Sequence, residues 1–299
     1  MAKATDKETN HYIIKELSKK APGPWAFSCA FDWLVIVLAF VGAGAWGHTM
    51  GYILAIFVIG NRQHGLALLG HDGTHYTIHK AKFWNDLISD VFAFWPVGLT
   101  TSGYRFVHFQ HHQHLNTAHD PELMHRSSKA PQWDLPVTPR KIALLSFLDL
   151  FGYSASDYFM IIKFAKPNSR WVYLPMAAMH ATFIIFFCVL QLYWVPLLWY
   201  AAVLTTFMMF FRIRTWLEHQ GSDDTHKIHL NWFENAVFAP HHSWHHYEHH
   251  SYPTVPLHRL HIVRRLLRED PGITMRELMR QYKAIALKSG TPTKPLPEV

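Results

Sequence analysis

Charged residues and cysteines are scarce in this chain of 299 residues. Asp, Glu, Lys and Arg make up 16% of it, and the only cysteines are Cys29 and Cys188. Two cysteines so far apart in sequence fit neither a disulfide scaffold nor a cysteine-based metal site. No cluster of glutamates has helical spacing, which argues against a carboxylate-rich soluble di-iron bundle. The N-terminus is polar for roughly 20 residues before any apolar run, so we expect no cleavable signal peptide.

Two long stretches are almost free of charge. Asp32 is the only charged side chain in residues 25–60, and residues 171–211 contain none. Each stretch is about twice the roughly 20 residues that one membrane-spanning helix needs, and each has a weak break, at 42–47 and at 191–196. We therefore predict an all-α integral membrane protein with four transmembrane helices in two hairpins, near residues 26–46, 49–70, 172–191 and 195–214. A soluble fold would need apolar partners for these hairpins that the rest of the chain lacks.

Basic residues predict the orientation of these helices. Lys and Arg occur in the N-terminal 24 residues, in the long loop between the hairpins and in the C-terminal part, but not in the two short turns within the hairpins. By the positive-inside rule both termini and the long loop are cytoplasmic. The net charge of +7 then reflects this topology and anionic headgroups rather than nucleic acid.

The chain is expected to form one membrane domain with short extensions. We predict a cytoplasmic lead-in over residues 1–24, a single domain over 25–270 with a cytoplasmic helical cap, and an amphipathic segment with a flexible tail over 271–299. Residues 84–101 are apolar but interrupted by polar residues, so we interpret them as an interfacial or re-entrant segment. The second span carries Asn61, Arg62, Gln63 and His64, which are expected to face the protein interior or a cavity.

Histidine is abundant and clustered. The chain contains 24 histidines, grouped at 71–75, at 108–114 and in the run 241–250, where pairs recur every four residues. Residues three or four apart share one face of a helix, and a helix opening at Pro240 would carry His242, His246 and His250 in one stripe. Neutral imidazole is a common ligand of iron, zinc, copper and nickel. Since every cluster falls at a span end or in a cytoplasmic loop, we predict a multi-histidine site for two metal ions in the cap.

A protein of another class also fits a histidine-rich membrane chain. A transporter of zinc or another divalent cation would carry many imidazoles, and imidazole alone does not distinguish iron from zinc or copper. Transporters, however, place polar ligands near the middle of the membrane in broken helices. Here the middle of each span is apolar, with His180 as the main exception.

In order and spacing, the histidine clusters resemble the three His boxes of the membrane fatty acid desaturase/hydroxylase superfamily. The matching motifs are His71-x-x-x-His75, His108-x-x-His111-His112 and His246-x-x-His249-His250. Arg214-x-x-x-Glu218-His219 and His249-His250-x-x-Pro253-x-x-Pro256 resemble that family too, and the resemblance covers about residues 60–265. H-x-x-H-H also occurs one turn earlier, at 242–246, but the spacing to Pro253 favours the later register.

The resemblance implies a non-haem di-iron centre that uses O₂ and two electrons to oxidise a C–H bond of a lipid. The implied metal ligands are His71, His75, His108, His111, His112, His219, His246, His249 and His250. Fatty acyl desaturation is the leading expectation; the alternative is a hydroxylase, ketolase or oxidative decarboxylase of a fatty acid, alkane or carotenoid. No haem or flavin domain is evident, so electrons are expected from a separate carrier, a ferredoxin or a cytochrome with its reductase.

Several further residues are candidates for supporting roles. Glu218 and Asp120 would each orient a ligand imidazole through its other nitrogen, although Asp120 also fits a solvated surface charge. His242 and His245 would lie beside the ligands or face water. Arg105 would meet an acidic headgroup or carboxylate, or simply solvent or lipid. An apolar tunnel is expected to end at the metals, and its candidate lining residues, which would equally suit a lipid-facing surface, are Phe92, Phe94, Trp95 and residues 207–211.

Overall fold

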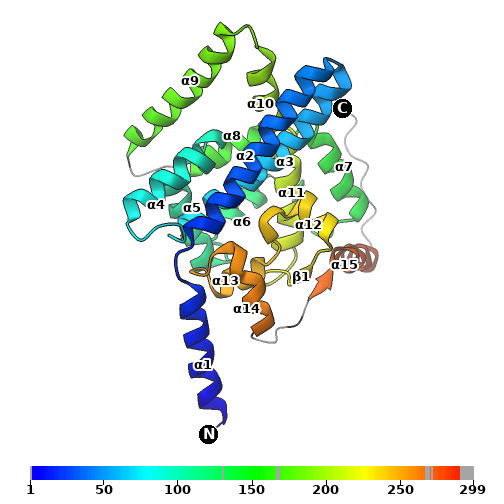
Figure 1. The fold of residues 1–299 in the computed structure, drawn as a ribbon. Helices are drawn as coiled ribbons and strands as arrows, with labels where there is room; N and C mark the ends of the chain where they lie inside the picture. Colours follow the sequence, from blue (N-terminus) through cyan, green and yellow to red (C-terminus); the bar gives the residue numbers. More distant parts are fainter. Residues whose placement is uncertain (1, 130, 166–168, 267–269, 271, 290–299) are drawn as a thin grey trace.

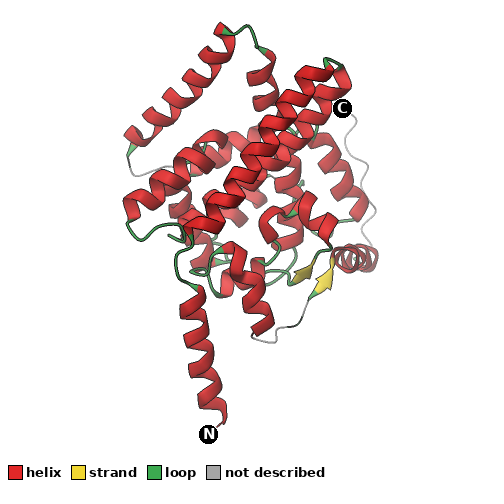
Figure 2. Ribbon diagram, in the orientation of Figure 1, coloured by secondary structure: helices red, strands yellow, loops and turns green. Residues whose placement is uncertain are grey.

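The computed structural model describes residues 2–129, 131–165, 169–266, 270 and 272–289, and this part of the chain is almost entirely helical (Figures 1 and 2). The helices of the apolar region are α2 (Pro22–Trp46), α3 (Thr49–Thr74), α9 (Tyr173–Val189), α10 (Trp194–Leu204) and α11 (Thr206–Glu218). The others are α1 (Ala2–Leu17), α4 (Lys82–Ser89), α5 (Thr101–His114), α6 (Pro121–Ser128), α7 (Pro139–Asp149), α8 (Ala155–Phe164), α12 (Trp232–Phe238), α13 (His246–Ser251), α14 (Leu260–Leu266) and α15 (Met275–Lys288). The strands β1 (Ile228–His229) and β2 (Ile273–Thr274) form a short parallel pair, with Ile228 opposite Ile273.

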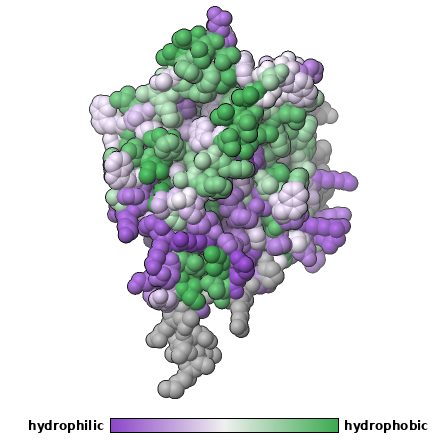
Figure 3. Space-filling view, in the orientation of Figure 1, coloured by the Kyte–Doolittle hydropathy of each residue, from purple (hydrophilic) through white to green (hydrophobic). Residues whose placement is uncertain are grey.

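Three helices of the described part are long and apolar enough to cross a membrane. They are α2, α3 and the continuous stretch Trp194–Glu218 that contains α10 and α11. The remaining predicted span, 172–191, corresponds to α9, an apolar helix of 17 residues. The helices therefore indicate an integral membrane protein, and the fourth crossing and the orientation stay predictions. Figure 3 shows most of the hydrophobic surface over the end that holds α2 and α9, whereas hydrophilic residues predominate in the opposite half and surround one hydrophobic patch there.

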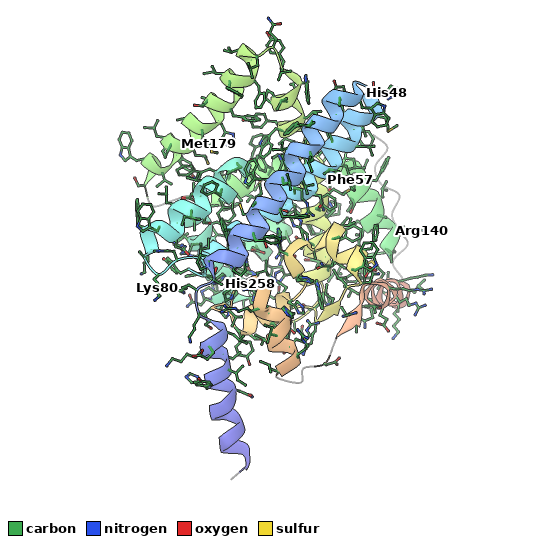
Figure 4. All side chains as sticks on the ribbon, in the orientation of Figure 1. His48, Phe57, Lys80, Arg140, Met179 and His258 are labelled. Carbon is green, nitrogen blue, oxygen red and sulfur yellow. The ribbon has the colours of Figure 1, made fainter. Side chains whose placement is uncertain are left out.

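The first hairpin has the predicted turn. Gly47 ends α2 in the left-handed conformation, with φ 61°, which glycine adopts at little cost. His48 then starts α3 by accepting a hydrogen bond from the Met50 amide at its ring Nδ1, at 3.2 Å. Figure 4 labels His48 at this tip of the molecule, far from Lys80 and His258 at the other half.

Close packing joins α3 to α11. At Gly60 an added Cβ would overlap the Thr206 hydroxyl and the Phe207 amide nitrogen, so the two helices approach more closely than any side chain would allow. Trp25, Ile36, Ile59, Leu66 and Trp199, from α2, α3 and α10, belong to one buried core. The second span and the start of α11 are thereby held in a fixed relation.

A buried charge network ties the hairpin to the third histidine cluster. Asp32 in α2 has no exposed surface; it accepts hydrogen bonds from Arg62 Nη1 at 3.0 Å and pairs with His241 Nε2 at 2.7 Å. Asn61 donates to the Val237 carbonyl at 2.6 Å, and Arg62 to the Ala236 carbonyl at 3.2 Å. Because a lone charge in a membrane helix is costly, these partners explain why Asp32, Asn61 and Arg62 occur in apolar spans.

The segment predicted to be interfacial or re-entrant is helical but irregular. After α4, a single π-helical turn spans Asp90–Phe94 and a 3₁₀ turn spans Trp95–Val97. The Asp90 carboxylate accepts the Thr101 amide at 2.6 Å, which joins this segment to the first turn of α5. Phe94 and Val97 are buried, whereas Phe92 is 51% exposed.

The helix α15 packs into the cap. Leu278 and Tyr282 share a buried core with Trp216 of α11, and the Tyr282 hydroxyl donates to the Trp216 carbonyl at 2.8 Å. The division of the chain at residue 270 stays a prediction, and the tail over 290–299, predicted to be flexible, lies outside the described residues.

Candidate metal centre

The histidines of all three clusters come together where four elements meet. The end of α3 supplies His71 and its C-cap His75, and the residue that follows α11 is His219. Helix α5 supplies His108, His111 and His112, and α13 supplies His246, His249 and His250. These elements are far apart in sequence, and α3 contacts both α5 and α11.

The imidazoles form two groups. In the first, the side chains of His71, His75, His108 and His249 each offer a nitrogen within 4.8 Å of the others. In the second, the same holds for His111, His219, His246 and His250. His112 lies beside both groups: its Nε2 is 2.9 Å from His108 Nε2 and 3.0 Å from His249 Nε2, and its ring stacks on His250 at 4.2 Å.

These nitrogens fit metal coordination better than mutual hydrogen bonding. His108 Nε2 has two neighbouring Nε2 atoms, both at 2.9 Å, and one ring proton cannot serve both contacts. Nε2 of His71 and of His111 are buried with no hydrogen-bond partner among the described residues. With metal–nitrogen bonds of about 2.1 Å, two ligands at right angles would be about 3.0 Å apart. The donor set therefore fits two ions, and an all-imidazole set suits first-row transition metals.

Burial keeps most of these rings neutral. It holds the pKa of His108, His246 and His249 well below the ordinary value of histidine, and lowers the pKa of His112 to about 4. A neutral ring keeps a lone pair for a metal ion. The protein therefore presents the nitrogens in the protonation state that metal binding requires.

His111 differs because carboxylates surround it. Burial favours its neutral form, but Glu122 and the hydrogen bond to Asp120 raise the pKa of His111 above its ordinary value. His111 Nδ1 donates to Asp120 Oδ1 at 3.0 Å, and Asp120 also caps α6 by accepting the Glu122 amide at 2.9 Å. A carboxylate on Nδ1 leaves Nε2 with its lone pair and orients the ring.

Carboxylates also support α13. Glu218 Oε2 lies 3.7 Å from His246 Nδ1, and its Oε1 accepts Arg214 Nε at 2.7 Å. Glu248 receives Arg264 Nε and Nη2 at 2.5 and 2.8 Å, a bidentate pair that fixes both partners. Glu248 and Arg264 were missed in the sequence, where nothing but the position of Glu248 inside the third cluster pointed to them.

The predicted single helix over the third cluster is wrong. His241 and His242 have positive φ angles of 61° and 60°, and α13 begins only at His246. His242 is exposed, so the stripe with His246 and His250 does not form. The bond from His241 to Asp32 draws the chain away from a helical path here. His245 is buried, stacks on Trp244 at 3.8 Å and lies 3.5 Å from Glu248.

Arg105 has a local structural role, and its contact with a headgroup or substrate stays a prediction. Its guanidinium pairs with Asp86 at 2.9 and 2.6 Å, donates to the Thr74 carbonyl at 2.8 Å and lies 3.9 Å over the Tyr76 ring. It thus closes the C-terminal end of α3, where carbonyls lack helical partners. Its guanidinium donors thus have partners within the protein.

Two adjoining cavities occupy the site. One, of about 330 Å³ including its mouth, lies among the histidines and is also lined by Tyr104, Glu122 and Glu218. The other, of about 490 Å³ including its mouth, is lined largely by apolar residues that include Phe94, Leu99 and Phe207. His71, Tyr104, Phe211 and Arg214 line both. Of the predicted tunnel residues, Phe94, Phe207 and Phe211 line these cavities, whereas Phe92 and Trp95 do not.

Some lining residues were not assigned to the site from the sequence. Tyr104 and Glu122 are ordinary cap residues by pattern, and only the Asp120-Pro121-Glu122 helix start pointed to Glu122. His64 was expected to face an interior or a cavity, and it lines the apolar cavity.

Membrane helices that carry a two-group histidine centre beside an apolar cavity are the features of a membrane metalloenzyme. The chain belongs to the fatty acid desaturase family, whose model matches residues 47–278. It is 24% identical over 286 residues to dihydrorhizobitoxine desaturase of Bradyrhizobium elkanii, with 87% of this chain and 75% of that protein covered. The resemblance drawn from the three His boxes is thus confirmed. The protein is an enzyme, an oxidoreductase of the desaturase family, and the transporter alternative loses its support.

Proposed function

We propose that this protein is a membrane desaturase that holds two iron ions and introduces a double bond into the aliphatic chain of a lipid. The observation that carries this proposal is the pair of four-imidazole groups beside an apolar cavity. His71, His75, His108, His112 and His249 would hold one ion, and His111, His219, His246 and His250 the other. The choice of iron rests on family membership, because imidazole binds several metals.

When bound, two irons would activate O₂ for hydrogen abstraction from an unactivated C–H bond. The balanced reaction is R–CH₂–CH₂–R′ + O₂ + 2 e⁻ + 2 H⁺ → R–CH=CH–R′ + 2 H₂O. The two electrons would come one at a time from a separate protein, a ferredoxin or a cytochrome with its reductase.

The residues of the chain would position the substrate and exclude water from the site. Phe94, Phe207 and Phe211 would hold an alkyl segment next to His71 and exclude water, since abstraction needs one carbon held against the oxidant. Asp120 keeps His111 in the tautomer that presents Nε2. Burial of the remaining imidazoles preserves their lone pairs.

The substrate is the least constrained part of the proposal. By its name the relative from Bradyrhizobium elkanii is a desaturase of dihydrorhizobitoxine, so the family name does not by itself select a fatty acid. The apolar lining of the larger cavity supports an aliphatic segment at the reacting carbon. Fatty acyl desaturation is therefore the form of the proposal that we would test first.

The test combines metal analysis with product analysis. We expect purified protein to contain about two iron per chain and little zinc, and we expect cells that express it to accumulate lipids two mass units lighter per new double bond. Cells that express the His108→Ala variant would serve as the control. Zinc without iron in iron-rich medium would overturn the di-iron proposal, and hydroxylated or keto products in place of alkenes would reassign the reaction.

A further inference from the structure

A histidine inside the second span remains outside the metal centre. His64 lies on α3, two helical turns before His71, and both residues line the apolar cavity. Seven residues of helix correspond to about 10 Å along its axis. The cavity therefore contacts His71 of the metal centre and, about two turns earlier along α3, His64.

His64 is buried but has no hydrogen-bond partner for either ring nitrogen. Its side chain is 1% exposed, and neither Nδ1 nor Nε2 finds a partner among the described residues. Phe207 and Phe210 pack around it with ring centroids at 6.1 and 6.2 Å, so an apolar ring would suit this environment. A buried polar group without a partner lowers stability, so a ligand or a water in the cavity would supply the missing partner.

The charge beside the cavity favours oxygen as the atom that His64 meets. Arg214 lines the same cavity, and its Nε is paired with Glu218. Arg62 also lies near His64, and its charge is paired with Asp32. These guanidinium groups would repel a cationic ligand group. A carbonyl, hydroxyl or ether oxygen, in contrast, accepts hydrogen bonds from N–H donors.

We propose that His64 is a positioning residue that hydrogen-bonds an oxygen atom of the substrate. The oxygen then lies about 10 Å along the helix axis from His71 of the metal centre, a distance that an extended alkyl chain spans in about eight bonds. This inference rests on the proposed function and adds the substrate class: an aliphatic molecule with a carbonyl, hydroxyl or ether group inside the cavity. A plain hydrocarbon segment would leave His64 without a partner.

The first measurement compares His64→Phe with His180→Phe. His180 is a matched control because both of its ring nitrogens are bonded, to the Tyr200 hydroxyl and the Trp95 carbonyl, each at 2.8 Å. We expect His64→Phe to keep its iron and melt at the same or a higher temperature, because it removes an unpaired polar group. His180→Phe should melt at a lower temperature. A lower melting temperature or loss of iron in His64→Phe would assign His64 a structural role and overturn the proposal.

The second measurement is ligand binding to the full chain in lipid nanodiscs. The probes are methyl octanoate, 1-octanol, dibutyl ether and n-nonane, and the readout is the ligand-dependent rise in melting temperature. We expect His64→Phe to bind at least one of the three oxygenated probes about tenfold more weakly than the wild type does. Binding of n-nonane should be unchanged, and His64→Gln should bind the oxygenated probe with an affinity between those of His64→Phe and the wild type. The three oxygenated probes separate carbonyl, hydroxyl and ether.

Equal binding of every probe by the wild type and by His64→Phe would overturn the proposal and leave only a buried water for His64. Binding is measured with and without iron, because binding to the iron-free protein does not depend on turnover. A wild type without iron or product that still prefers an oxygenated probe through His64 would refute the proposed function and not this inference.

Discussion

Asp120 shows how a single carboxylate serves both a local structure and the metal centre. Its oxygens cap the first turn of α6 and accept the Nδ1 proton of His111. The pKa of His111 is raised even though burial opposes it, because Glu122 and Asp120 favour its charged form. The same electrostatic support makes the ring a stronger metal ligand.

Replacing Asp120 by Asn should weaken metal binding while leaving α6 intact. Asn is as good an N-cap as Asp, but it lacks the charge that supports His111, and loss of such a partner costs about 10- to 100-fold in metal affinity. Competition with a chromogenic chelator measures the change. Asp223→Asn, at an exposed position, is the control, and equal affinity in both variants would contradict this role of Asp120.

Substitutions of His219 and His242 distinguish the two possible ligand sets of the third cluster, 242–246 and 246–250. His219 is 5% exposed and its Nε2 lies 2.7 Å from His246 Nε2, whereas His242 is exposed and outside both groups. We expect His219→Ala to abolish turnover and lower bound iron, and His242→Ala to keep most of both. Iron content and product yield are measured side by side. The reverse pattern would refute the ligand set.

At the scale of elements, α2 does more than cross the apolar layer. Asp32 connects it to Arg62 of α3 and to His241 before α13. The left-handed residues His241 and His242 are therefore held against the hairpin. Through this contact the first span sets the position from which α13 presents its imidazoles.

Asp32→Ala should destabilise the whole protein. It leaves Arg62 buried without its carboxylate, and breaking a buried pair from one side costs about 3–5 kcal/mol. Thermal unfolding in detergent should show a clear fall in melting temperature together with lower iron content. Glu16→Ala, which breaks the solvent-exposed pair with Lys19, should change stability by no more than about 1 kcal/mol. Equal melting of the two variants would show that the Asp32 network adds little.

At the scale of the whole molecule, the proposed topology places the cap and both termini in the cytoplasm. Arg140 and His48 are both exposed, and Figure 4 labels them at well-separated places on the molecule. In a variant without Cys29 and Cys188, Cys at position 140 or 285 should react with an impermeant maleimide only after the cells are opened. Cys at position 48 should react in intact cells. Labelling of position 140 in intact cells would reject this orientation.

Much of the architecture followed from pattern alone. The apolar runs located α2, α3 and the stretch Trp194–Glu218, and the spacing of the histidines led to the family that the chain belongs to. The prediction of a continuous helix from Pro240 was wrong because the spacing of histidines carries no information about the bond between His241 and the distant Asp32. Arg105 lies just before the second His box, and nothing in that position indicated its bond to Asp86.

The sequence by itself determined that this is a helical membrane protein with a histidine-based metal site, because hydrophobic length and ligand spacing are local properties of a chain. Its oxidoreductase activity was implied by the resemblance of its His boxes to those of the desaturase family. Only the tertiary structure decided how the imidazoles divide into two groups, which carboxylates orient them and which residues line the cavities. Those features depend on contacts such as Asp32 with His241 and Asp120 with His111. A short-range pattern cannot encode them, because they arise where helices distant in the sequence pack together.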